Sequence, residues 1–198
     1  NGTGAIQLDG LSWPTSDGST DQVLKTDGSG ALSWSSAATS INGLSDALVE
    51  NNSTYLGNDP SSTTDNALRN VAIGLIALDA ITTGDNNVAV GYNSLTANTT
   101  GSDNMGVGYN ALKANIGGNG NSAIGSGSMA SNTTGLFNTG VGSNSLNDNI
   151  NGSRNVGIGN SSLRDNSSGS DNTAVGKSSG QLITTGDDNV VIGHEAGI

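Results

Sequence analysis

The chain has 198 residues, of which 31 are Gly, and only 32% are hydrophobic. Its 17 acidic residues stand against 6 Lys or Arg, for a net charge of -11, and it contains no Cys. Without a basic cluster it lacks the main driving force for binding nucleic acid or anionic lipid. It also has no thiolates for disulfides or metal sites, and no apolar run of about 18 residues that could span a membrane.

The first 39 residues form a zone with its own pattern. The triplet LSW occurs at 11–13 and again at 32–34, around the turn signals SDGS and TDGSG. Short apolar stretches bounded by Asp-Gly turns are typical of β-hairpins. We therefore predict a β/loop segment over residues 1–39.

Residues 40–66 are expected to connect this segment to the rest of the chain. Ser40 is a candidate N-cap, and Ile41, Leu44 and Leu48 follow at helical spacing. This pattern predicts a short helix, which could form a three-stranded bundle as a neck. The polar stretch NDPSSTTDN at 58–66 then reads as a linker.

From residue 67 onward the sequence repeats with a period of 17 residues. A glycine returns at every seventeenth position, and an Asn stands four residues before each of these glycines. The repeated pairs are Asn70 and Gly74, Asn87 and Gly91, Asn104 and Gly108, Asn121 and Gly125, Asn138 and Gly142, Asn155 and Gly159, Asn172 and Gly176, and Asn189 and Gly193.

Other positions of the repeat are equally regular. The residue two before the glycine is Ala or Gly in all units but the last, a second glycine follows ten residues later in the first seven units, and Leu or Met follows four residues later in the first six. The residue directly before the glycine is always apolar and forms the column Ile73, Val90, Val107, Ile124, Val141, Ile158, Val175 and Ile192.

A 17-residue unit with two glycine corners is too short for two helices but suits one coil of a parallel β-solenoid with two short strands. In NVAV, Val88 and Val90 share one face, and Asn87 and Ala89 share the other. Stacking would align the Asn side chains in a hydrogen-bonded ladder. Eight coils at the strand spacing predict an all-β solenoid over 67–198, roughly 40 Å long.

The repeat predicts an apolar core too thin for a single chain to fold alone. Ordering 17 residues costs roughly 17 to 34 kcal/mol, whereas burying each Val, Ile or Leu returns only about 1.5 to 3 kcal/mol. The small Ala or Gly column would let another chain pack closely on the strand. We therefore expect several chains to share one core, in an oligomer that does not dissociate without unfolding.

Units such as NNVAVGYNSLTANTTG resemble the repeats of YadA-like trimeric autotransporter adhesin heads and related repeats of bacteriophage tail fibres. In these heads the repeat implies a left-handed, homotrimeric β-roll with the Asn-to-Gly segment as the inner strand. The resemblance covers residues 70–198. The LSW zone is also similar to segments of phage tail fibres, which favours a virion protein.

Several chemical motifs reduce to the repeat. DNTAVGKSSG has Asp171 in place of the first P-loop glycine, and GGNGNSAIG has Ser122 in place of a calcium-ligating Asp. His194 is the only histidine, beside Glu195, and has no second imidazole or Cys. The acids at one corner form a stripe rather than a catalytic pair: Asp85, Asp103, Asp171, Asp187 and Asp188.

We therefore expect no catalytic, cofactor-binding or metal-binding residues and no enzyme activity. The expected function is a structural shaft or head segment of a trimeric phage tail fibre or similar virion appendage that supports host attachment. The alternative is the passenger head of a bacterial trimeric autotransporter adhesin on the cell surface. Expected partners are two further copies, other fibre or tail proteins, and a host glycan or receptor bound through a distal domain.

Overall fold

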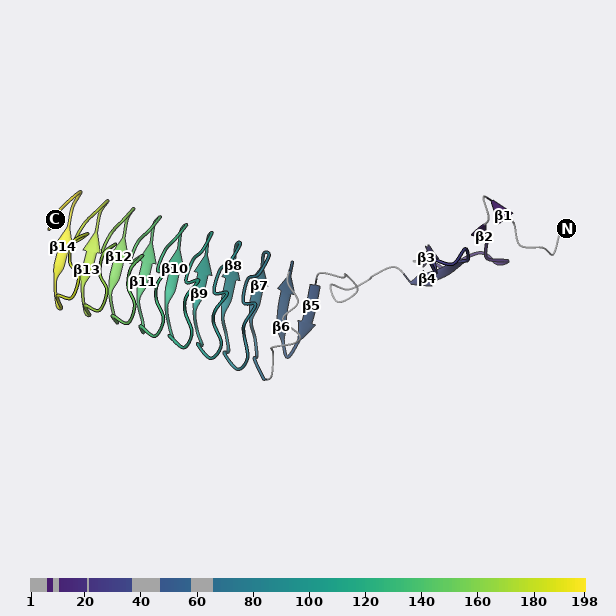
Figure 1. Ribbon diagram of the computed structural model, residues 1–198, viewed down its shortest axis with the longest axis horizontal. Helices are drawn as coiled ribbons and strands as arrows, with labels where there is room; N and C mark the ends of the chain where they lie inside the picture. The colour runs from purple at the N-terminus through teal and green to yellow at the C-terminus, as the bar shows by residue number, and fades with distance from the viewer. Residues whose placement is uncertain (1–6, 9–10, 21, 37–46, 58–65) are drawn as a thin grey trace. The chain divides into compact units, whose positions relative to one another are not determined.

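The computed structural model describes residues 7–8, 11–20, 22–36, 47–57 and 66–198. The chain divides into two units, Asn1–Ser45 and Asp46–Ile198. All regular secondary structure in the described part of the chain is β-strand (Figure 1). The all-β fold class is thus confirmed.

The first unit contains two small antiparallel pairs. Strand β1 (Gln7–Leu8) pairs with β2 (Leu11–Ser12), and β3 (Gln22–Thr26) pairs with β4 (Leu32–Ser36). Ser12 of β2 also lies in a bridge beside Ala31. The hairpin prediction for this zone is therefore confirmed.

Side chains hold the turns of this unit in place. The carboxylate of Asp27 accepts hydrogen bonds from the backbone N–H groups of Ser29 and Ala31, at 2.8 and 3.0 Å. These bonds lower the pKa of Asp27. The indole of Trp34 donates to the carbonyl of Ser16 at 2.7 Å and packs on Gly18. The two Asp-Gly turns therefore contribute local structure to the β3–β4 hairpin.

The second unit is a parallel β-solenoid whose strands form one ten-stranded sheet in chain order. All neighbours are parallel except the first pair, β5 and β6. Figure 1 shows the coils stacked one after another, each with one arrow on the same side. The strands are β5 (Ala47–Glu50), β6 (Ser53–Leu56), β7 (Val71–Ile73), β8 (Val88–Val90), β9 (Met105–Val107), β10 (Ser122–Ile124), β11 (Thr139–Val141), β12 (Val156–Ile158), β13 (Thr173–Val175) and β14 (Val190–Ile192).

The strands pair in register, so equivalent residues of the repeat stack directly. Ala89, for example, lies opposite Ala72 on one side and Gly106 on the other. We number the coils from coil 1 (70–86) to coil 8, which begins at residue 189. The spacing of 17 residues predicted from the sequence is thus confirmed as the length of one coil.

The glycine that ends each strand is required by backbone geometry. Gly74 and its seven equivalents have φ between 127 and 136°, a conformation that side chains strongly disfavour. A Cβ at Gly74 would also lie 2.7 Å from the carbonyl oxygen of Gly91 in the next coil. Both restraints act from Gly74 to Gly176 and the positive φ acts at Gly193 as well, which explains the unbroken glycine column.

The prediction of two strands per coil is wrong. Each coil contains one three-residue strand, and the segment after the corner consists of turns in the described structure. In that segment Asn93 and Leu95 have φ of 60 and 50°, which a β-strand cannot accommodate. Its backbone still bonds between coils, as from Leu95 N–H to the Ala111 carbonyl at 3.0 Å.

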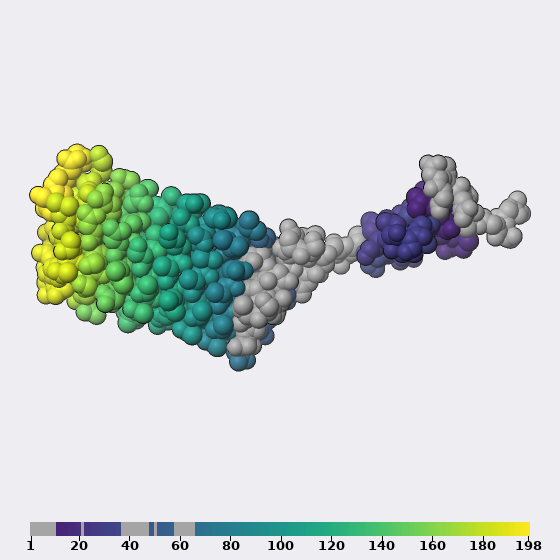
Figure 2. All heavy atoms as spheres, in the orientation of Figure 1, coloured from purple at the N-terminus to yellow at the C-terminus, as the bar shows by residue number. Residues whose placement is uncertain are grey.

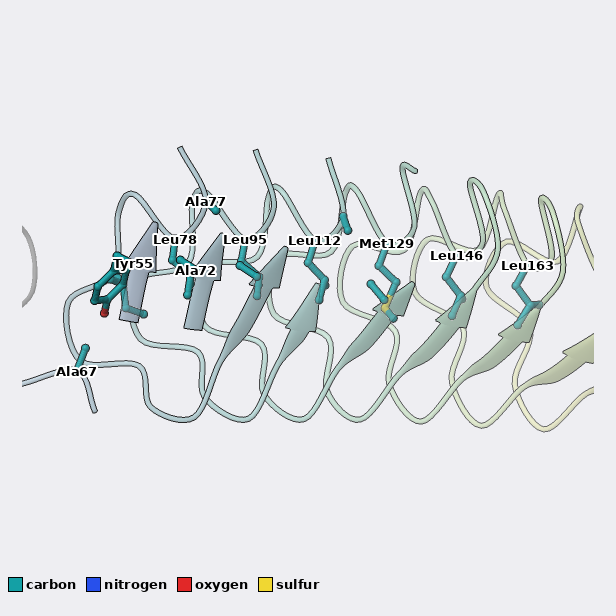
Figure 3. Packing of buried hydrophobic residues seen from close by; sticks show 14 of the residues in the cluster. Tyr55, Ala67, Ala72, Ala77, Leu78, Leu95, Leu112, Met129, Leu146 and Leu163 are labelled. Carbon is teal, nitrogen blue, oxygen red and sulfur yellow. The ribbon is translucent and has the colours of Figure 1, made fainter. Parts of the chain in front are cut away.

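The core is a line of single large apolar side chains inside the coils (Figure 3). Its fully buried Leu and Met residues face the small residue in the middle of each strand. A Cβ on Gly106 would lie 3.3 Å from Cγ of Leu95, so the small residue makes room for this column. The column is Leu78, Leu95, Leu112, Met129, Leu146 and Leu163.

This arrangement corrects the role proposed for the small column. Ala72, Ala89, Ala123 and Ala174 are fully buried inside their own coils. The expectation that another chain packs on them is therefore wrong. Their small size serves the packing within the chain, because a larger side chain would displace the Leu column.

The last coils carry their large apolar group at a different position. Gly180 replaces Leu in coil 7, and Cδ1 of Ile183 lies 3.1 Å from where its Cβ would be. In coil 8, Gly197 takes the Leu position and Val191 fills the same space, with Cγ1 at 3.0 Å. Most coils thus hold one main apolar group, supplied from one of these positions, whereas coil 1 buries both Leu78 and Ile81.

The hairpin β5–β6 continues the sheet beyond coil 1. Residues 53–57, STYLG, lie 17 residues before NVAIG and pair with it, so Tyr55 stands opposite Ala72. Tyr55 is fully buried and fills the interior at this end. The helix predicted from Ser40 is wrong where the chain is described, because Ala47–Glu50 is a strand. Residues 40–46 and most of the predicted linker, 58–65, lie outside the described residues.

Candidate functional site: the outer face of the sheet

The repeated asparagines form the predicted ladder inside the solenoid. Nδ2 of Asn121 donates to Oδ1 of Asn104 at 3.2 Å and to the carbonyl of Gly135 at 2.8 Å. Its own Oδ1 accepts from the backbone N–H and Nδ2 of Asn138, at 3.0 and 3.2 Å. The same bonds recur from Asn70 to Asn189, so this column is structural.

A second buried ladder escaped the sequence analysis. It consists of Asn98, Asn115, Asn132, Asn149 and Asn166, each bonded to the next through side-chain amides at 2.7 to 3.0 Å. The sequence signal was an Asn seven residues after the corner glycine, hidden because it appears in five coils only. At its end Oδ1 of Asn166 has no hydrogen-bond partner, since Ile183 takes the next position.

Serines complete the polar interior. Ser94, Ser128, Ser145 and Ser162 are fully buried, and each hydroxyl donates to a strand carbonyl of the next coil at 2.8 to 3.0 Å. Buried polar groups are tolerated when they are paired in this way. The inside of the coil is therefore closed to ligands by its own side chains.

The predicted apolar column lies on the outer face of the sheet. Val88 and Val90 share one face, as the sequence predicts, but that face points away from the interior and both side chains are half-buried. Ile73, Ile124 and Ile158 are 44, 39 and 40% exposed. The column thus contributes little to the core of its own chain.

The outer face is formed by the first and third residues of the eight strands β7–β14. It carries Val, Ile, Met, Ser and Thr and no charged residue. Figure 2 shows the coils of this unit packed directly against one another, which makes their faces continuous. Its dimensions are about 34 by 10 Å from the strand spacing and rise, an uncharged area on the order of 300 Å².

Residues singled out for possible chemistry lie apart from this face. Lys177 is exposed directly after the corner glycine of coil 7. The imidazole of His194 faces Glu195 at 3.4 Å, and both side chains are largely exposed. Among the described residues no three His, Cys, Asp or Glu side chains gather as a metal site.

The acidic stripe has a structural role at the corner before each Asn. Oδ1 of Asp85 accepts from the backbone N–H of Leu68 at 2.8 Å, and Oδ1 of Asp187 accepts from Ser170 at 2.7 Å. Arg154 forms two bonds to the carboxylate of Asp171, at 2.6 and 2.7 Å. This pair lowers the pKa of Asp171 and raises that of Arg154.

No helix in the part of the chain that the structure describes has the length and apolar character needed to cross a membrane. None of the protein-family models, curated proteins or solved structures compared with the chain matches it. The candidate site is therefore defined by the solenoid geometry and the exposed apolar face alone.

Proposed function

We propose that this chain is a structural segment of a trimeric fibre, most simply a phage tail fibre or similar virion appendage. In this role three solenoids pack their outer sheet faces together as left-handed β-rolls around a common axis. The observation that carries the proposal is the uncharged, largely apolar outer face. The resemblance of the repeats to trimeric fibre proteins supplies the number of chains.

The physical argument is the cost of leaving this face in water. Isolated exposed apolar residues are ordinary, but continuous apolar surfaces of several hundred Å² mark interaction sites on soluble proteins. Interface centres are also depleted in charge, as this face is. A net charge of -11 per chain opposes random association, so an ordered contact through the uncharged outer face is favoured.

The fibre role follows from the repeat. In a solenoid each coil contacts only its neighbours, so coil number sets length without changing the rest of the structure. Such a segment can space and stiffen a fibre. A distal domain would then contact the receptor or glycan. Other fibre or tail proteins would bind the ends of this segment.

Val107→Asp tests the proposed interface. Val107 is half-buried in the single chain, where the new carboxylate can reach water, but it would be desolvated between three chains. We expect sedimentation equilibrium to show a trimer for the wild type and a folded or partly unfolded monomer for the variant. Thr100→Asp, at an exposed corner away from the sheet face, should remain trimeric.

A wild-type monomer that is folded in dilute solution would overturn the proposal. Retention of the trimer by Val107→Asp with unchanged thermal stability would show that a different face mediates assembly. The control separates a general effect of added negative charge from a specific effect at the sheet face.

A further inference from the structure

Three large apolar side chains are exposed at one corner of three consecutive coils. Ile116 is 50% exposed in coil 3, Phe137 is 61% exposed at the end of coil 4, and Ile150 is 48% exposed in coil 5. Leu136, beside Phe137, is half-buried. These four residues, the corner patch, lie outside the strands β7–β14 that form the uncharged face.

The patch extends over three adjacent coils, with Thr133 between Ile116 and Ile150. The backbone N–H of Ile116 donates to the carbonyl of Thr133 at 3.0 Å, and Thr133 donates to Ile150 at 2.8 Å. The ring of Phe137 lies against Gly120, which leaves space for it in coil 3. The apolar groups therefore occupy adjacent coils of one corner.

Each residue of the patch replaces a polar residue found in other coils. At the positions of Ile116 and Ile150, most other coils have Thr or Ser. Their hydroxyls bond to the next coil, as from Oγ1 of Thr82 to the Thr99 carbonyl at 2.9 Å. Ile116 and Ile150 cannot make this bond. The substitution gives up stabilisation within the solenoid.

Leu136 gives up a second kind of inter-coil bond. At its position in other coils a side-chain oxygen accepts a backbone N–H of the preceding coil, as Ser170 does for Ser153 at 3.1 Å. Leu has no acceptor. The chain thus loses hydrogen bonds and exposes a Phe at the same place, which favours a binding role over a structural one.

Charges flank the patch on both sides along the same corner. Asp103 lies in coil 2, and Asp171, Asp187 and Asp188 lie in coils 6 and 7. Arg154 is paired with Asp171, which leaves two further carboxylates on the C-terminal side. The centre of the surface is apolar except for Arg154 of coil 5, which is paired with Asp171, and the ends are acidic, more strongly at the C-terminal end.

We infer that the corner patch binds a polypeptide segment with an apolar centre and basic flanks, whose more basic end lies over coils 6 and 7. The apolar centre would cover Ile116, Phe137 and Ile150, which span about 10 Å at the strand spacing. Lys or Arg side chains would face the flanking carboxylates. A second copy of this acidic chain fits poorly because its charges would repel.

Selection of peptides against the intact protein tests this inference. A library of random 15-residue peptides is displayed on yeast and sorted for binding to the wild type. The protein is compared with the variant Ile116→Thr, Leu136→Ser, Phe137→Asp and Ile150→Thr. These residues occur at the same positions in other coils, so the variant should keep its fold. Leu182→Ser removes an equally exposed apolar side chain elsewhere and is the control.

We expect the enriched peptides to carry aromatic or aliphatic centres flanked by Lys or Arg. A labelled synthetic peptide should bind the fourfold variant at least tenfold more weakly than the wild type, by fluorescence anisotropy, and bind Leu182→Ser unchanged. Asp188→Asn should weaken binding severalfold, and added salt should do the same.

Four outcomes would overturn the inference. They are the absence of enriched peptides, enrichment without basic residues, equal binding to the fourfold variant, and a lower oligomeric state of that variant in sedimentation. The last result would make the patch a contact between copies. It is distinguishable from failure of the trimer proposal, which is tested by Val107→Asp in strand β9.

Discussion

At the scale of single residues, stability rests on buried polar side chains to an unusual degree. Asn121 makes two donor bonds and accepts two more while fully buried. Because each Asn bonds both neighbours, the ladders connect coils that share few apolar atoms. Asn has the donor and acceptor geometry for this role, which Asp and Leu lack.

Asn121→Ala should therefore destabilise the protein strongly. The change leaves the backbone N–H of Asn138 without its partner in the interior, and leaves the carbonyl of Gly135 with only the longer bond from Nδ2 of Asn132, at 3.3 Å. Each unsatisfied group costs about 1 to 3 kcal/mol, so we expect a loss of about 2 to 4 kcal/mol per chain in urea unfolding. Asn160→Ala, at an exposed corner, should change stability by less than about 0.5 kcal/mol. Equal losses in the free energy of unfolding for the two variants would contradict a stabilising role of the ladder.

At the scale of one coil, most interiors hold one main apolar group together with the Asn and Ser columns, whereas coil 1 holds Leu78 and also Ile81, which takes the position of the second ladder. Leu163 provides this group in coil 6 and Ile183 in coil 7, from different positions of the repeat. Supplying the apolar group from position 183 costs a hydrogen bond, because Ile183 interrupts the second ladder and leaves Oδ1 of Asn166 unpartnered. Volume and hydrogen bonding are thus coupled within each coil.

The pair Gly180→Leu and Ile183→Asn tests this coupling. In Gly180→Leu alone, the new side chain meets Cδ1 of Ile183, which must turn toward the corner glycine as Ile81 does beside Leu78 in coil 1, so we expect a loss of about 1 kcal/mol. Ile183→Asn alone should leave a cavity and cost about 2 to 4 kcal/mol. Together they recreate the arrangement of coil 6, in which Leu163 has φ of 49°, and Gly180 already has φ of 57°.

The double variant should be at least as stable as the wild type, because the new Asn can donate to Asn166. A double-mutant cycle in urea unfolding measures the coupling, which should favour the pair by at least about 2 kcal/mol. Additive losses would show that the apolar group and the ladder position are independent.

At the scale of the whole solenoid, the number of coils sets the length and can change without unfolding the coils that remain. Every coil presents the same register to its neighbours, so β7 can pair with a later strand as well as with β8. The hairpin β5–β6 differs from the coils, because its Tyr55 fills the interior at the N-terminal end of the solenoid. Coils are therefore exchangeable, whereas the hairpin β5–β6 is not.

Deletion of residues 87–137 should remove three coils and leave a folded, shorter solenoid. The new junction joins Asn86 to Asn138, which preserves the period of 17 residues. We expect the maximum dimension from small-angle X-ray scattering to fall by about 14 Å at the strand spacing. Deletion of residues 87–133 breaks the period and should unfold the solenoid. Folding of both variants would show that register is not required.

The sequence by itself determined the period, the corner glycines, the first Asn ladder and the parallel β-solenoid, because in-register stacking places the same residue type at the same point of every coil. Strand alternation also placed Val88 and Val90 on one face of the strand and Ala89 on the other. The second ladder was missed because its positions in coils 1 and 7 hold Ile81 and Ile183.

Only the tertiary structure decided which face is inside and how the rest of each coil is folded. Ala89 and Val90 are both apolar, and their order of burial depends on Leu95, which enters the same space from the opposite wall. Leu95 does so in a left-handed backbone conformation that its residue type disfavours and that inter-coil hydrogen bonds stabilise. Likewise Leu48 fits a helix by spacing, but pairing with Tyr55 across the hairpin places it in a strand. Contacts between segments outweighed local preference at each of these positions.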